Sequence, residues 1–575
     1  MAADAAFMEK LVALCKRRGF IFQSSEIYGG IGGFWDYGPL GVELKRNIKN
    51  AWWHDYVTCP PDGPDGKPLQ MLGLDSSIIM NPKVWEASGH ATGFADPMQS
   101  CRHCRKLYRA DQVEGMLSQS EWYISLAEEF ELGLDDRRLS EWIRRIGRKK
   151  SPGLAIVRDQ SNVHPRVGEV LRGLGATRGQ FSHFVGLVAS PMDRVASTET
   201  RPCPSCGGDL TEPRQFNLMF DSHAGAVKGD ENKVYLRPET AQGIFVNFKN
   251  VLDTSRVKIP FGIAQVGKAF RNEINPRNFT FRSREFEQME IEFFCRGAEE
   301  AAAGQPSDMD WYQFWRKNRY DWYVRHGLKS EKLRLRDQAK EELAHYSRAC
   351  ADIEYLFPFS DEHQELEGCA HRGCFDLSQH EKHSGVDLHY FDEEAWARCL
   401  AERKACGEPE LTKDQKQEIA GKPPYRFVPT VIEPSAGADR ATLAFLCEAY
   451  TEDSKPDAKG VMQTRVYLRF HPRLAPIKAA FLPLVNKEGM PEVAEALYRE
   501  ARRHFNAFFD DGGSIGRRYA RMDEAGTPYC ITIDGDTVKT GGENAGTVTI
   551  RDRDTLEQVR VSREHVVAWL RERIG

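Results

Sequence analysis

Two neighbouring segments of this chain carry arginines, acids and aromatic rings at spacings that suit nucleotide chemistry. Residues 270–273 read Phe-Arg-Asn-Glu, and residues 281–294 read Phe-Arg-Ser-Arg-Glu-Phe-Glu-Gln-Met-Glu-Ile-Glu-Phe-Phe. Arginine makes planar, bidentate contacts to phosphate oxygens that lysine cannot make. The ring of Phe286 offers a face on which a purine can stack. The two segments therefore predict a site for a nucleoside polyphosphate.

The residues around these side chains predict two strands joined by a loop. An apolar approach over residues 261–270 delivers Arg271 to a strand end, and residues 275–278 (Asn-Pro-Arg-Asn) form a turn. In the second strand, alternation places Glu290 and Glu292 on one face, opposite an apolar face that consists of Met289, Ile291 and Phe293. A charged hairpin with a solvated face is the simpler alternative, and charge alone favours it.

The order of these elements resembles motif 2 of the class II aminoacyl-tRNA synthetases. The residues themselves are most similar to those of the homodimeric type of glycyl-tRNA synthetase. Residues 39–82 resemble motif 1 of that family, with a helix from Pro39 to about residue 56, a strand over residues 72–80 and then a proline. Motif 1 lies at the dimer interface in the family, so the resemblance implies a homodimer. Residues 431–440 resemble motif 3, which places Arg440 near a helix N-terminus that favours anions.

The resemblance implies roles for individual residues in binding ATP with Mg²⁺. Arg271 would grip the α-phosphate and the amino-acid carboxylate, and Glu273 would meet the adenine amino group. Phe286 and Arg440 would sandwich the adenine ring. Arg282 would hold the outer phosphates, and Glu365 would hold magnesium together with ATP. The expected catalytic residues are Arg271, Glu273 and Arg440, and the expected ATP site adds Asn272, Arg282, Ser283, Phe286, Glu365 and Leu366.

The same resemblance implies a binding site for glycine. Glu239, Glu290 and Glu433 would surround the ammonium group with Ser435 beside them, and Arg109 would contact the carboxylate. From its local pattern alone, Glu239 is equally well explained as an acid at a helix start. A site for glycine can exclude larger amino acids by filling the space of their Cβ atom. The implied reaction is the ATP-dependent attachment of glycine to the 3′ end of tRNA(Gly) through a glycyl-adenylate.

Two Cys-x-x-Cys pairs predict a metal site. Four thiolates from Cys101, Cys104, Cys203 and Cys206 can complete a tetrahedral zinc shell, and such a shell leaves no open position for a substrate. We therefore expect structural Zn²⁺. Unrelated free cysteines are the alternative, because the two pairs lie far apart in the sequence.

The length and composition of the chain set the remaining expectations. A chain of 575 residues predicts two to four domains, and no apolar run approaches the roughly 18 residues of a membrane span. The N-terminus lacks the pattern of a signal peptide, so we expect a cytoplasmic protein without a membrane partner. The net charge of −5 gives no global electrostatic attraction to nucleic acid, so tRNA must meet local basic patches.

The predicted fold is a mixed α+β arrangement of three parts. A discontinuous class II catalytic domain over residues 1–100 and 207–472 has an antiparallel β-sheet flanked by helices. Residues 101–206 form an insertion bracketed by the two cysteine pairs. Residues 473–575 alternate strands and helices and resemble the mixed α/β anticodon-binding domain of the family.

Three alternative functions remain open at this point. A prolyl- or threonyl-tRNA synthetase shares the architecture. A synthetase-like paralogue that binds RNA without catalysis is a second alternative, although such proteins usually lose an ATP-binding residue. A zinc-ribbon module that binds nucleic acid explains only the four cysteines.

Overall fold

The computed structural model describes residues 5–102, 104–118, 203–205, 210–298, 300, 305–340, 343, 347–456 and 462–574. The chain divides into two compact units, one of residues 1–88 and 219–575 and one of residues 89–218. The second unit contains the predicted insertion and extends beyond both of its expected boundaries. Among the described helices, none combines the length and the hydrophobicity that crossing a bilayer requires.

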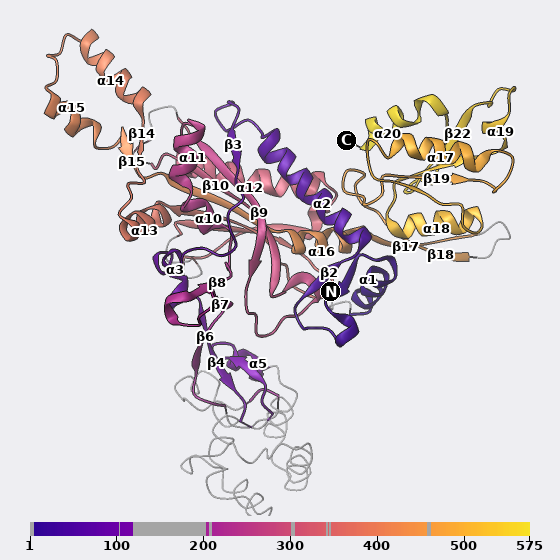
Figure 1. The fold of residues 1–575 in the computed structure, drawn as a ribbon, viewed down its shortest axis with the longest axis horizontal. Coiled ribbons are helices and arrows are strands. Elements are labelled where there is room, and N and C mark those ends of the chain that lie inside the picture. The colour runs from indigo at the N-terminus through magenta and orange to yellow at the C-terminus, as the bar shows by residue number, and fades with distance from the viewer. Residues whose placement is uncertain are drawn as a thin grey trace, which may run out of the picture. The chain divides into compact units, whose positions relative to one another are not determined.

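A seven-stranded sheet forms the centre of the first unit (Figure 1). All of its neighbouring strands are antiparallel except β3 and β9, which are parallel. In spatial order the strands are β11 (Leu333–Asp337), β12 (Ala349–Tyr355), β13 (Gln364–Gly373), β16 (Thr430–Gly437), β10 (Glu285–Cys295), β9 (Phe261–Phe270) and β3 (Gln70–Gly73).

The predicted pair of strands is confirmed as β9 and β10, which pair antiparallel from Glu285–Phe270 to Phe294–Phe261. The apolar face of β10 is buried in the main hydrophobic core, as the alternation predicts. The opposite face is not solvated: Glu290 and Glu292 are only 1% and 0% exposed. The alternative of a hairpin with a solvated charged face is therefore wrong, because the acids line the interior of the unit.

Helices cover both faces of this sheet. One face packs against α1 (Ala5–Arg18), α2 (Pro39–Trp53), α12 (Asp308–Arg325) and α16 (Ala438–Ala449), which share one core with β10 and β16. A second core joins β9 to α10 (Ala241–Phe245), α11 (Phe248–Ser255) and α13 (Phe375–Ser384). The start of α12 is fixed by reciprocal bonds between Ser307 and Asp310, which satisfy two backbone N–H groups that lack helical partners.

The motif 1 region differs from its prediction in two details. The α2 helix begins at Pro39 as predicted and continues as a π-helical turn over His54–Thr58. The following strand ends at Gly73 instead of continuing to residue 80. Beyond it, the backbone N–H and hydroxyl of Ser76 bond to the Gln265 side chain, so a side chain replaces the strand pairing there.

The remaining described elements of the first unit's N-terminal and central parts are short hairpins and peripheral helices. They are β1 (Ile21–Gln23), β2 (Trp35–Tyr37), α3 (Pro82–Ala87), β7 (Asp221–His223), β8 (Lys233–Tyr235), β14 (Tyr390–Phe391), α14 (Glu393–Ala405), α15 (Lys413–Ala420), β15 (Arg426–Phe427), β17 (Tyr450–Pro456) and β18 (Met462–Leu468).

The C-terminal part of the first unit contains a five-stranded mixed sheet, which confirms the predicted mixed α/β fold of this region. Its strands, in spatial order, are β20 (Ala507–Phe509), β19 (Ala479–Pro483), β21 (Tyr529–Ile533), β22 (Thr547–Asp552) and β23 (Gln558–Ser562). The helices α17 (Met490–Ala501), α18 (Ile515–Ala525), α19 (Gly535–Val538) and α20 (Val566–Ile574) accompany it. The helix α17 ends at Ala501, and the chain returns to the sheet a few residues later as β20.

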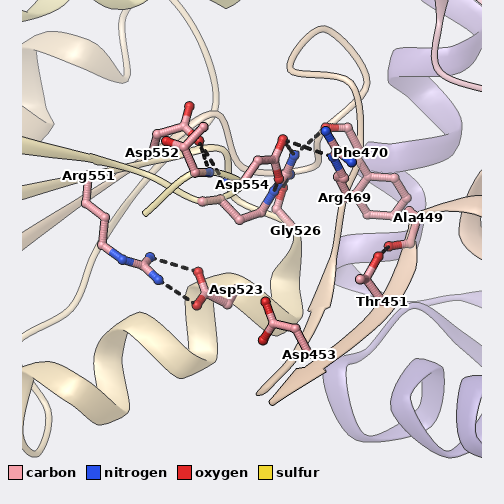
Figure 2. A network of polar contacts seen from close by, with 12 residues as sticks. Ala449, Thr451, Asp453, Arg469, Phe470, Asp523, Gly526, Arg551, Asp552 and Asp554 are labelled. Atoms are coloured by element: carbon pink, nitrogen blue, oxygen red, sulfur yellow. Dashed lines mark hydrogen bonds and ion pairs between the residues drawn. The ribbon is translucent and has the colours of Figure 1, made fainter. Parts of the chain in front are cut away.

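Two buried arginines of the C-terminal part stabilise it: Arg551 pairs within this part (Figure 2), and Arg553 joins it to the segment that follows β18. The Arg551 guanidinium donates two bonds of 2.9 Å to the Asp523 carboxylate. Arg553 is buried, and it donates to the carbonyl oxygens of Phe470 and Gly526 at 2.8 and 2.7 Å. Arginine suits this position, because its fixed set of donors can satisfy several acceptors at once.

The second unit is built on a three-stranded antiparallel sheet in the order β5 (Leu107–Arg109), β4 (Ala95–Ser100) and β6 (Arg214–Asn217). The short helices α4 (His90–Gly93) and α5 (Val113–Ser118) belong to the same unit. Its described core contains two of the predicted zinc ligands, Cys101 and Cys203, together with Tyr108.

Candidate active site

A pocket in the first unit brings together most of the residues expected to bind ATP. It lies at β10, β13 and β16 and includes the loop between β9 and β10. The lining residues are Arg271, Glu273, Thr280, Phe281, Arg282, Ser283, Phe286, Gln288, Glu365, Leu366, Gly368, Ser435, Gly437, Asp439 and Arg440. Asn272 is the one member of the expected ATP set that is not among them.

Arg271 stands at the end of β9, where it is held on two sides. Its Nε donates to the carbonyl oxygen of Pro238 at 3.0 Å, and its guanidinium carbon lies 5.4 Å from the centre of the Phe286 ring. The strand pairing places these two side chains on adjacent strands. Arg271 is thus preoriented beside the ring predicted to stack on a purine.

The loop between β9 and β10 is held by its own charged residues. The Nε of Arg282 donates to the Glu273 carboxylate at 2.8 Å, and the Nε of Arg284 donates to the Glu273 carbonyl oxygen at the same distance. Arg284 also donates to the carbonyl oxygen of Gly32 at 2.7 Å. Two residues with separate expected contacts to ATP, Glu273 and Arg282, therefore pair with each other here.

Arg440 lines the pocket from the first turn of α16. Its guanidinium carbon is 4.7 Å from the centre of the Phe281 ring, and one of its nitrogens lies 3.3 Å from the Glu365 carboxylate. This charge lowers the pKa of Glu365, which is half-exposed and therefore open to a ligand. Ser283 and Leu366 complete this wall, and the Ser283 hydroxyl donates to the Glu285 carbonyl oxygen.

A buried cluster of acids adjoins the pocket. The hydroxyls of Ser435 and Thr240 both donate to the Glu290 carboxylate, the former at 2.7 Å. The Gln288 side chain donates to Glu290 at 3.4 Å and to the Ser435 hydroxyl at 3.3 Å. Because Ser435 and Gln288 also line the pocket, they connect the ATP side of the site to the acids.

A single arginine pairs with the deeper acids. Arg372, at the end of β13, donates to both oxygens of Glu433 at 2.9 Å and to both oxygens of Asp376 at 2.8 and 2.9 Å. The Gln242 amide then donates to Asp376 and Glu239 at 3.0 Å each. Arg372, Asp376 and Gln242 thus connect Glu433 to Glu239, and an oxygen of Glu290, which Ser435 contacts, lies within 4.8 Å of an oxygen of Glu433, although β8, β10, β16 and their loops lie far apart in the sequence.

Burial and mutual repulsion raise the pKa values of two of these acids, Glu290 and Glu433. Burial is the largest cause that raises the pKa of Glu290, followed by the charge of Glu239. Burial also raises the pKa of Glu433, to about 8, although Arg372 opposes the shift. A cationic ligand would favour the charged forms, so this site is suited to an ammonium group.

Several residues of the site were not identified from the sequence. Gln288 and Glu292 share the face of Glu290 on β10, so the alternation that found Glu290 also contained them. Thr240 and Arg372 carry no comparable sequence signal. Their positions depend on the turn before α10 and on the end of β13, which meet the acids only in the folded chain.

A charged network lies behind the pocket and links α2 to the start of α16. The buried Lys45 ammonium lies 2.8 Å from the Asp439 carboxylate and 2.7 Å from that of Glu287. The Tyr37 hydroxyl donates to Asp439 at 2.7 Å, and Lys49 lies 2.8 Å from Glu287. Since Asp439 precedes Arg440, this network fixes the helix turn that carries Arg440.

Three of the four predicted zinc ligands converge in the second unit. The Sγ atoms of Cys101, Cys104 and Cys203 lie within 4.8 Å of one another, and those of Cys104 and Cys203 are 3.6 Å apart. Thiolates around tetrahedral zinc lie about 3.8 Å apart, given a Zn–S bond of about 2.3 Å. The described part of the cluster therefore fits zinc, and the fourth predicted ligand, Cys206, lies outside the described residues.

Arg109 belongs to the second unit, at the end of β5. It forms ion pairs with Asp96 at 3.1 Å and with Asp111 at 2.9 Å. Its expected contact with a glycine carboxylate is therefore not part of the pocket described above, and it stays a prediction.

Comparisons with known proteins agree with this geometry. Residues 225–387 match the tRNA synthetase class II core domain (G, H, P, S and T), and residues 478–573 match an anticodon binding domain. The chain is 50% identical to the glycine–tRNA ligase of Rhodopirellula baltica, over 99% of each chain. It is 43% identical to that of Geobacillus thermodenitrificans, over 99% of this chain and 98% of the relative. It is 42% identical to that of Thermobifida fusca over the full length of both.

Proposed function

This chain belongs to the glycine–tRNA ligases of the class II aminoacyl-tRNA synthetases, and we propose that it attaches glycine to the 3′ end of tRNA(Gly). The observation that carries the proposal is the adjacency of two sites. A pocket of arginines and aromatic rings, suited to ATP, shares Ser435 and Gln288 with a buried acid cluster suited to an ammonium group.

The first step is the transfer of an adenylyl group to glycine. A carboxylate oxygen of glycine attacks the α-phosphorus of ATP in line, the bond from this phosphorus to the β-phosphate oxygen breaks, and pyrophosphate leaves. Catalysis of this kind depends on positioning and on neutralising charge. Arg271 holds the α-phosphate and the glycine carboxylate, while Arg282 holds the outer phosphates.

The adenine ring is held between Phe286 and Arg440, which both line the pocket. Glu273 then accepts from the adenine amino group, which requires ATP to separate it from Arg282. Glu365 offers a half-exposed carboxylate for Mg²⁺, which offsets the charge that develops on the phosphates when it is bound.

The acid cluster selects glycine. Glu239, Glu290 and Glu433 surround its ammonium group, and Ser435 holds Glu290 in place. In the second step, the terminal ribose hydroxyl of tRNA(Gly) attacks the glycyl carbonyl carbon, and AMP leaves. Residues 473–575 read the anticodon, which the match to an anticodon binding domain supports.

The proposal also includes a bound metal ion, an oligomeric state and a cellular location. The cysteines at residues 101, 104, 203 and 206 hold a structural Zn²⁺, which the described sulfur positions support. The chain works as a homodimer through the motif 1 region. It acts in the cytoplasm, where its tRNA substrate is used.

ATP–pyrophosphate exchange tests the proposal directly. Purified protein with magnesium is assayed with glycine, alanine, serine, proline or threonine in turn. We expect exchange with glycine alone. Exchange with proline or threonine instead would overturn the glycine specificity, and no exchange with any of the five, with or without tRNA(Gly), would favour a paralogue without catalysis.

A further inference from the structure

Glu292, a buried acid next to the proposed glycine site, has no role in the function proposed above. Glu292 follows Glu290 by two residues on β10 and is 0% exposed. Both of its carboxyl oxygens are buried without a hydrogen-bond partner in the described part of the chain. A buried carboxyl group without partners is costly, so such a group is expected to be neutral or to await a ligand.

The charged groups around Glu292 come from four elements. Glu290 lies on its own strand, Glu433 lies on β16, and Asp376 lies on α13. Arg372 on β13 is the only cation among them, and both of its bidentate contacts go to Glu433 and Asp376. Burial is the largest cause that raises the pKa of Glu292 far above its ordinary value, and Glu433 adds to it.

The carboxyl groups of Glu290, Glu292 and Glu433 converge on one point. Each offers an oxygen that lies within 4.8 Å of the oxygens of the other two. The centre of three such oxygens lies at most about 2.8 Å from each, so a nitrogen at or just above it is within the length of a charge-assisted hydrogen bond of all three. An ammonium group has three N–H donors, so its donors match the three carboxyl groups in number.

We propose that Glu292 is a further carboxyl ligand of the substrate ammonium group, in addition to Glu239, Glu290 and Glu433, and that it loses its own proton when that group binds. This inference rests on the proposed glycine specificity and adds to it a residue outside the expected glycine set. In the free enzyme, Glu292 is a neutral acid between two other carboxyl groups. When the ammonium group enters, the Glu292 O–H bond breaks, the proton passes to solvent, and the carboxylate accepts a hydrogen bond from the substrate.

The loss of this proton makes glycine binding depend on pH in a defined direction. Because the proton must leave, the KM for glycine falls as pH rises, by up to about tenfold per pH unit while the cluster is still protonated. Glycine binding also releases a proton. A purely structural role for Glu292 predicts neither effect.

The full-length wild type is compared with its Glu292→Gln variant and with a control variant, Glu285→Gln. Glu285 is a partly exposed glutamate on the same strand, and it pairs with Lys268 outside the site. The glycine KM and kcat of exchange are measured across a range of pH. Proton release on glycine binding is measured by calorimetry in two buffers with different heats of ionisation. Thermal unfolding at neutral pH checks each variant, and we expect Glu292→Gln to unfold no earlier than the wild type, because glutamine replaces a neutral acid.

We expect Glu292→Gln to raise the glycine KM at mildly alkaline pH by about tenfold, because the substrate loses one hydrogen bond to a charged group. The glycine KM of this variant should also depend less on pH. The kcat changes far less, and the variant releases fewer protons than the wild type, whereas Glu285→Gln behaves as the wild type. An unchanged pH profile in Glu292→Gln, or a wild type that binds glycine without releasing a proton, would overturn the inference. A wild type that exchanges with another amino acid and not with glycine would overturn the proposed function first and this inference with it.

Discussion

Arg271 is the residue on which the proposed adenylation step depends most. Its guanidinium is preoriented by the Pro238 carbonyl oxygen and by the Phe286 ring, so it loses little conformational freedom when a phosphate arrives. Lysine at the same position would offer a point charge without the planar, bidentate geometry.

Replacing Arg271 by alanine should abolish adenylate formation and leave tRNA binding largely intact. The variant removes the charge that neutralises the α-phosphate, and the loss of one such donor costs on the order of 100-fold in rate or more. ATP–pyrophosphate exchange and a filter-binding assay with tRNA(Gly) give the two measurements. Arg325→Ala, an exposed residue at the end of α12, is the control. Activity of Arg271→Ala equal to that of the wild type would disprove the assignment of the ATP site.

Ser435 connects the ATP pocket to the acid cluster, and its loss should affect glycine more than ATP. Its hydroxyl donates to Glu290 at 2.7 Å, and a hydrogen bond to a charged group contributes about 1.5–3 kcal/mol. We expect Ser435→Ala to raise the KM for glycine by about tenfold or more and to leave the KM for ATP nearly unchanged. Steady-state exchange with each substrate varied in turn measures both constants. A rise confined to ATP would contradict this role.

At the scale of elements, the helix α2 and the first turn of α16 are coupled by buried charge. Lys45 pairs with both Asp439 and Glu287, and these carboxylates raise its pKa although its burial opposes the shift. Removing one partner of a buried ion pair leaves the others uncompensated.

Lys45→Met should therefore lower the stability by about 3 kcal/mol and raise the KM for ATP, because Asp439 and Arg440 share the turn that the network fixes. Denaturant unfolding measures the first effect, and exchange kinetics measure the second. Arg46→Met is the matched control, since Arg46 is exposed on the same helix and forms a surface ion pair at i,i+3 with Glu43. If both variants lose stability equally, the network does not have this role.

The cysteine cluster is expected to stabilise the compact unit that contains it, residues 89–218. We expect Cys104→Ser to lose about one zinc per chain and to make this unit more sensitive to proteolysis, since a closed four-ligand site contributes directly to folding. Elemental analysis and limited proteolysis measure these changes. The exposed Cys59 provides a control, as Cys59→Ser. Glycine activation should persist in Cys104→Ser, and a zinc content equal to that of the wild type would refute the site.

At the scale of the whole molecule, the proposed homodimer is open to a direct test. The motif 1 region contributes α2, whose Lys45 pairs with the pocket residue Asp439, so an interface there would lie near the active site. Sedimentation equilibrium at micromolar concentration should give about twice the chain mass of 65.3 kDa. A monomer under these conditions would contradict the prediction.

The sequence by itself determined the strands β9 and β10 and most of the residues that line the ATP pocket. The first strand follows from an apolar run and the second from alternation, and the resemblance to motif 2 of the class II synthetases implied the roles of Arg271, Glu273 and Phe286. The start of α2 at Pro39 and the mixed fold of the C-terminal part were equally local properties. Such features are predictable because they depend on neighbours a few residues away.

Only the tertiary structure decided which acids are buried and what faces them. Alternation placed Glu290 and Glu292 on one face of β10, but it could not tell whether water or Arg372, Glu433 and Asp376 would cover that face. Those partners come from β13, β16 and α13, and their approach depends on the order of strands in the sheet. The strand predicted over residues 72–80 was too long for the same reason, since the strand ends at Gly73 and at Ser76 the Gln265 side chain of β9 replaces backbone pairing. Burial and long-range pairing are properties of the assembled sheet, and they turned a charged strand into a candidate ammonium site.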